Sequence, residues 1–288
     1  MKEETVFLEI AKIDLTASKY LYSKHLYSHS IFHLQQAVEK STKYFGIFMK
    51  IISMDEAKKS IGHDAWKLYL KIFKEFKNRM RKLEGLLTKY EKVKEMSLIK
   101  DLNWLFELEN KIHKYEQMLN FSTQDLFNIS LSNEELQTII EEIQKVDERL
   151  KKAALSEKIE EGNISEFRKK IYELLDLASS INPNINKDVI EKELDAMVRP
   201  QIVTSLFEKL RDPIIRIAFC SIRLFYLSIV LSPHYVKSRY PEDKFNPLEI
   251  YTANMALVQK LEYFLNLTEN VIKDLEHISQ FDTLKMVI

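Results

Sequence analysis

The stretch SIFHLQQAVEKSTK, residues 30–43, decides the fold class of this chain. Apolar side chains recur in it at Ile31, Leu34 and Val38, a spacing of three and four residues that is typical of one face of an α-helix. The same spacing continues through residue 47 and occurs upstream between Leu8 and Leu21. The pattern therefore predicts two amphipathic helices that meet near residues 24–28.

The composition extends this prediction to the whole chain. Only 4 Gly and 6 Pro occur in 288 residues, of which 45% are hydrophobic and 30% charged, so little sequence is available for the turns of a β-rich fold. The apolar run from Ile214 to Leu231 approaches membrane-spanning length, but Arg216 and Arg223 lie on it one heptad apart. We therefore expect an all-α protein in which residues 202–231 form a core helix that ends at Pro233.

The middle of the sequence has a different character. From about residue 76 to residue 204 it is rich in Lys and Glu with a narrow apolar stripe. Apolar positions in residues 98–119 and 136–150 predict an antiparallel helical hairpin that could project from the molecule, and Ser132 with Glu135 forms a capping box for its second helix. Asp64 is a plausible N-cap for an earlier helix, and residues 248–277 predict a last amphipathic helix.

Charge and cysteine content limit the function classes. The 43 basic and 43 acidic residues cancel, so any contact with nucleic acid must be local. The single cysteine, Cys220, lies in an apolar stretch and cannot form an intramolecular disulfide. Since the first residues also lack the apolar core of a signal peptide, we expect a cytoplasmic protein without a membrane segment.

Three motifs carry a resemblance to a known family. Residues 30–43, Gly62-His63-Asp64 and the sequence YVKSRYP at residues 235–241 follow one another in the order found in HEPN domains, which the chain resembles. The resemblance implies a four-helix up-and-down core built from residues 1–75 and 205–288. Residues 76–204 would then be an inserted helical arm.

The resemblance also bears on activity. Many HEPN proteins are metal-independent ribonucleases with an Arg followed after four to six residues by a His, and no Arg here has a His at that distance. The nearest arrangement, His234 and Arg239, is in reverse order. The resemblance therefore implies a non-catalytic nucleotide-binding or interaction module, homodimeric and working with a nucleotidyltransferase partner in trans. A divergent ribonuclease using His63, His234 and Arg239, with RNA as its substrate, and a structural dimerisation scaffold stay open as alternatives.

Candidate binding residues follow from charge and spacing. Lys40 and Lys43 could hold a phosphate as point charges, and Arg239, followed by Tyr240, could add a bidentate clamp. Glu39 and Lys43 also have the i,i+4 spacing of an exposed ion pair, which is the simpler interpretation.

Histidine positions suggest further chemistry, each with a simpler alternative. His63 beside Asp64 could be catalytic, or could serve only to bond a backbone carbonyl. His29 and His33 have an i,i+4 spacing that can place two ligands on one metal, but no matching Asp, Glu or Cys pattern accompanies them. We expect no metal and no cofactor.

Overall fold

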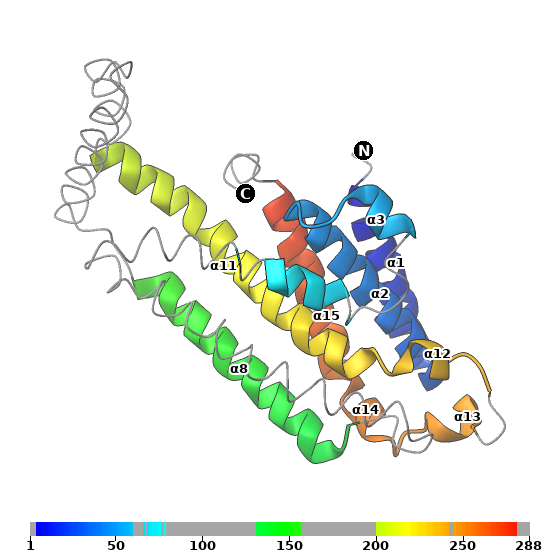
Figure 1. Ribbon diagram of the computed structural model, residues 1–288. Coiled ribbons are helices and arrows are strands. Elements are labelled where there is room, and N and C mark those ends of the chain that lie inside the picture. Colours follow the sequence, from blue (N-terminus) through cyan, green and yellow to red (C-terminus); the bar gives the residue numbers. More distant parts are fainter. Residues whose placement is uncertain are drawn as a thin grey trace.

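The computed structural model describes residues 4–59, 66, 68–75, 78, 131–156, 200–241 and 245–280 (Figure 1). The described residues contain no β-strand, which confirms the all-α prediction. The helices are α1 (Thr5–Ser23), α2 (Tyr27–Phe48), α3 (Met54–Lys59), α8 (Asn133–Ser156), α11 (Pro200–Leu231), α12 (His234–Lys237), α13 (Pro247–Ile250), α14 (Ala256–Gln259) and α15 (Leu261–Ser279).

Helices α1 and α2 form an antiparallel pair around a three-residue turn. His25 in this turn has a positive φ of 59°, and the Leu26 N–H donates to the Leu21 carbonyl at 2.9 Å. Farther from the turn, the Ser18 hydroxyl donates to the Ser30 carbonyl at 2.7 Å, and the Ser30 hydroxyl donates to the Ser18 carbonyl at 2.9 Å. The predicted break near residues 24–28 is therefore confirmed.

The core lies where α1, α2, α11 and α15 meet. α2 contacts α1, α11 and α15, and α11 also contacts α15. The side chains of α11 from Cys220 to Leu231 are all buried, because neighbours surround this helix, as expected for a helix that is apolar on every side. No helix in the described part of the chain combines the length and hydropathy needed to cross a membrane. The four-helix up-and-down arrangement that the resemblance implies stays a prediction.

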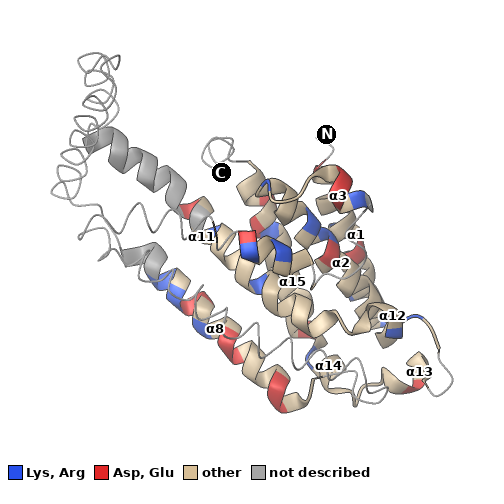
Figure 2. Ribbon diagram, viewed as in Figure 1, with Lys and Arg blue, Asp and Glu red and all other residues tan. Residues whose placement is uncertain are grey.

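Helix α8 packs along α11 on one flank of the bundle (Figure 1). Its predicted capping box is present: the Ser132 N–H donates to the Glu135 carboxylate at 2.8 Å, and the Glu135 N–H donates to the Ser132 hydroxyl at 3.2 Å. Leu136, Ile139 and Ile143 are buried, while acidic and basic residues are mixed along the rest of the helix (Figure 2). Part of the predicted arm thus contacts the core.

Several predictions concern residues outside the described ranges. These are the first helix of the hairpin, at residues 98–119, the Asp64 cap and the placement of His63. The boundaries of core and insertion remain predictions.

The prediction of a single last helix was wrong. Residues 247–279 form three helices, α13, α14 and α15, separated by turns at residues 251–255 and at Lys260. The side chain of Tyr251 is buried and its hydroxyl lies 2.9 Å from Nδ1 of His234, so the chain must turn here to bring Tyr251 against α12. This tertiary contact overrides the helical periodicity of the local sequence.

Candidate functional site

The polar side chains of α2 form a continuous row of contacts. Gln36 Nε2 donates to Gln35 Oε1 at 2.6 Å and to Glu39 Oε2 at 3.3 Å. Lys40 Nζ donates to Gln36 Oε1 at 2.6 Å and lies 3.5 Å from Glu39 Oε1, while Lys43 Nζ lies 2.8 Å from the same carboxylate oxygen. Both lysines are therefore engaged by other side chains of their own helix.

The Glu39–Lys43 pair has the predicted spacing, but the prediction that it is exposed was wrong. The side chain of Glu39 is 1% exposed and that of Lys43 is 9% exposed. Neighbouring helices cover this part of α2, and Lys43 Nζ lies 6.0 Å from the centre of the Phe7 ring on α1. A buried ion pair depends on each partner, because either charge alone would carry a large desolvation cost.

Arg239 and Tyr240 lie just after α12, against α2. The Arg239 guanidinium carbon is 4.7 Å from the centre of the Phe32 ring and 4.9 Å from that of the Tyr240 ring. Its Nε donates to the Tyr235 carbonyl at 3.2 Å. Both Arg239 and Tyr240 are exposed, and no carboxylate among the described residues pairs with Arg239. The guanidinium plane is thus held in place with its terminal nitrogens available at the surface.

The predicted phosphate-binding residues occupy two places along α2. The structure brings Lys40 and Lys43 together with Glu39, whereas Arg239 lies beside Phe32. Phe32 and Lys43 are eleven residues apart, which is about 16 Å along a helix axis. The exposed Arg239 and the two lysines that pair with Glu39 therefore lie in two separate places.

His234 is buried within the fold. It is 1% exposed, and its Nδ1 lies 2.9 Å from the Tyr251 hydroxyl, with the two rings edge to face. Burial lowers the pKa of His234 from 6.5 to about 3. A neutral, enclosed imidazole is poorly suited to exchange protons with a substrate, and Arg239 is stacked elsewhere, on Phe32.

The other histidines with a predicted role have separate partners. His33 Nδ1 lies 3.0 Å from Asp14 Oδ1, and His29 Nδ1 lies 3.2 Å from the hydroxyl of its neighbour Ser28. The first contact connects α2 to α1, and the second lies within the first turn of α2. Both histidines of the i,i+4 pair therefore make structural contacts.

The burial of His234 predicts a pH dependence of stability. Its folded pKa of about 3 lies below its ordinary value of 6.5, so stability is fully present above about pH 6.5 and is lost as the pH falls toward 3. In this window, His234 should contribute a slope of up to about 1.4 kcal/mol per pH unit. The free energy of unfolding, measured with urea between pH 7 and 4, should depend less steeply on pH for His234→Gln than for the wild type. The exposed His29→Gln control should keep the wild-type slope; equal slopes in all three proteins would contradict the assignment.

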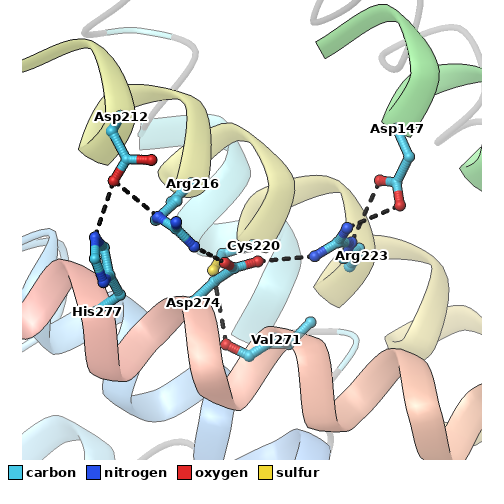
Figure 3. Close-up of polar contacts among 8 residues, drawn as sticks. All are labelled: Asp147, Asp212, Arg216, Cys220, Arg223, Val271, Asp274 and His277. Carbon is cyan, nitrogen blue, oxygen red and sulfur yellow. Dashed lines mark hydrogen bonds and ion pairs between the residues drawn. The ribbon is translucent and has the colours of Figure 1, made fainter. Parts of the chain in front are cut away.

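A second polar cluster joins three helices (Figure 3). Arg223 on α11 donates from Nη2 to Asp147 on α8 and from Nη1 to Asp274 on α15, both at 2.8 Å. Arg216, one heptad earlier, donates from Nη1 to the other Asp274 oxygen at 2.6 Å and from Nε to Asp212 at 2.9 Å. These ion pairs connect α8, α11 and α15, with Arg223 buried and Arg216 and Asp212 nearer the surface.

Burial and ion pairing shift the pKa of Asp274 in opposite directions. Desolvation raises the pKa of Asp274, and Arg223 and Arg216 act against that shift. Asp212 raises the pKa of Arg216 and also lies 3.0 Å from Nε2 of His277. The sequence signal for the cluster was the heptad spacing of the two arginines, which served only to argue against a membrane span. The partners of Arg223, Asp274 and Asp147, lie 51 and 76 residues away from it and could not be predicted from the sequence. Only the Asp212–Arg216 pair has a local signal, an i,i+4 spacing.

The fold and these clusters define an all-α bundle whose buried charges are largely paired within the chain. Residues 5–153, just over half of the sequence, match the HEPN domain family. The chain belongs to the HEPN domain family, which associates it with nucleotide-binding and ribonuclease-like modules. The matched region extends from α1 into α8. No curated protein and no solved structure matches the chain.

Proposed function

We propose that the protein is a non-catalytic nucleotide-binding module whose ligand is held by Arg239 and Tyr240. The observation that carries the proposal is the exposed guanidinium of Arg239, whose carbon lies 4.7 Å from the centre of the Phe32 ring and 4.9 Å from that of the Tyr240 ring. Its terminal nitrogens can donate two parallel hydrogen bonds to a phosphate. The exposed Tyr240 ring offers a surface on which a base can stack.

The non-catalytic part of the proposal has separate support. His234 is enclosed and bonded to Tyr251, and the pKa of its imidazole is far below neutral pH. Lys40 and Lys43 are committed to Glu39 and Gln36, so we assign them to the interior of the fold. We therefore place the binding function on Arg239 and Tyr240.

The proposal includes two partners. One is a nucleotidyltransferase acting in trans, which we propose because the resemblance to HEPN domains implies it. We also propose that the protein is a homodimer, since α1 has an exposed apolar face.

Thermal unfolding with added nucleotides tests the proposed function. A ligand at 100 times its dissociation constant stabilises the folded state by about 2.7 kcal/mol, so millimolar AMP or ATP should raise the melting temperature. Inorganic phosphate and adenosine, added separately, should each give a smaller rise, because each engages only one of the two residues. No shift with any nucleotide would contradict the proposal.

RNA incubated with the protein in the absence of metal ions should remain intact. Cleavage that disappears in a His234→Ala variant would instead support the ribonuclease alternative, as long as the variant stays folded. A dimer without nucleotide binding would support the structural scaffold.

A further inference from the structure

Helix α1 is apolar on two of its faces. Leu8, Ala11 and Leu15 point into the bundle and are buried. A second stripe is exposed to solvent, with Val6 and Ile10 each 38%, Tyr20 63% and Ile13 68% exposed. Ala17, which is half-buried, lies between Ile13 and Tyr20 on the same face, so the exposed stripe consists of Val6, Ile10, Ile13, Ala17 and Tyr20. A contiguous apolar stripe on a surface helix indicates an interaction site.

The charges beside the exposed stripe are paired within the chain. Lys12 pairs with Glu9 at 2.8 Å and with Glu276. Lys19 pairs with Glu269 at 2.7 Å. On the other side of the stripe, Asp14 lies 3.0 Å from Nδ1 of His33. The stripe therefore offers an occupant apolar contacts and little unpaired charge, which fits an equally apolar surface better than an acidic or basic peptide.

The exposed stripe is also complementary to itself. Val6 and Tyr20 lie seven residues on either side of Ile13, the most exposed member. If two α1 helices run antiparallel around a two-fold axis at Ile13, Ile13 meets the partner's Ile13 and Val6 meets the partner's Tyr20. Ile10 then lies level with the partner's Thr16 and next to its Ala17, which is one residue, about 1.5 Å, farther along the helix. Each large side chain faces an equal or smaller one, as close packing requires.

We propose that α1 is the dimer interface, pairing antiparallel with α1 of a second copy across a two-fold axis at Ile13. This inference rests on the homodimer of the proposed function and names its surface. α1 lies on the opposite side of the bundle from α8, so the pairing leaves the α8 flank accessible (Figure 1). A 19-residue helix is about 28 Å long and its stripe buries less than the roughly 800 Å² per partner of a standard interface. The dimer is therefore expected to be concentration-dependent.

Sedimentation velocity over a concentration series tests the surface. The wild-type protein should shift from monomer to dimer, and Ile13→Asp should weaken the dimer by roughly 100-fold or more, because the change acts twice at the axis. Leu248→Asp is the matched control: Leu248 on α13 is 70% exposed, close to the 68% of Ile13, and should leave the dimer unchanged. Equal weakening by both substitutions would contradict the assignment.

A cysteine cross-link tests the arrangement. The native Cys220 is fully buried and burial raises the pKa of its thiol, so it should not react. Ile13→Cys should form a disulfide-linked dimer on mild oxidation, because the two introduced thiols meet at the axis. Thr16→Cys is exposed too, but its two copies would lie about 9 Å apart along the helices and should cross-link poorly.

The outcomes separate this inference from the proposed function. A wild-type dimer that survives Ile13→Asp, without an Ile13→Cys cross-link, would overturn the α1 interface and leave the homodimer standing. A wild-type protein that stays monomeric at every concentration would overturn both the interface and the homodimer. Nucleotide binding to Arg239 and Tyr240 is measured independently of either result.

Discussion

Replacing Arg223 with methionine is expected to lower the free energy of unfolding by about 3–5 kcal/mol. The side chain of Arg223 is 8% exposed and holds Asp147 of α8 and Asp274 of α15 at 2.8 Å each. Without the guanidinium, Asp274 would keep only Arg216, and Asp147 would lose its ion-pair partner on α11. Since desolvation already raises the pKa of Asp274, the loss of Arg223 should make its ionised form still more costly. Urea unfolding at pH 7 measures the change.

Arg216→Met is the matched control for this prediction. Arg216 lies on the same helix and shares Asp274, but its side chain is 31% exposed and water can replace its contacts. Its loss should therefore cost much less than that of Arg223, about 1 kcal/mol or less. Equal losses for the two variants, or a stable Arg223→Met protein, would contradict the assignment of Arg223 as the buried centre of the cluster.

Glu39→Ala is expected to destabilise the protein by a similar amount, about 3–5 kcal/mol. The Glu39 carboxylate is 1% exposed, and Lys43, 9% exposed, would lose its partner at 2.8 Å. The cost comes from an unpaired ammonium group. The double variant Glu39→Ala/Lys43→Met should therefore lose less free energy of unfolding than the two single variants lose together. Urea unfolding of the four proteins gives this coupling energy.

Lys40→Met provides the comparison within the same row. Lys40 is 16% exposed and 3.5 Å from Glu39, so its loss leaves the closer Lys43 pair intact and should cost less than the loss of Glu39. Additive effects of Glu39→Ala and Lys43→Met would show that the two side chains are not coupled. In that case Lys40 and Lys43 would again be candidates for binding phosphate.

Much of the local structure follows from the sequence. Apolar spacing predicts α1 and α2 and the turn between them, and the Ser132–Glu135 capping box marks the start of α8. α11 ends at Leu231, just before Pro233, as the sequence predicts, although the same helix accommodates Pro213. These signals lie within a few residues of the feature that they determine, so one sequence is enough to detect them.

Features that depend on distant residues could not be predicted. Spacing identifies Glu39 and Lys43 as a pair, but their burial depends on helices that pack over α2. The turn at Tyr251 depends on His234, and the stack of Arg239 depends on Phe32, more than 200 residues earlier. In each case the deciding partner lies on another element, where neither periodicity nor a local motif gives its position.

The central claim is that Arg239 and Tyr240 hold a nucleotide. Isothermal titration with AMP, comparing wild-type protein with Arg239→Gln, tests it most directly. Losing the charged hydrogen bonds to phosphate, about 1.5–3 kcal/mol, should raise the dissociation constant roughly 10- to 100-fold. The exposed position of Arg239 should keep the variant's melting temperature near that of the wild type. An unchanged dissociation constant in Arg239→Gln, or no binding by the wild-type protein at millimolar AMP, would contradict the claim.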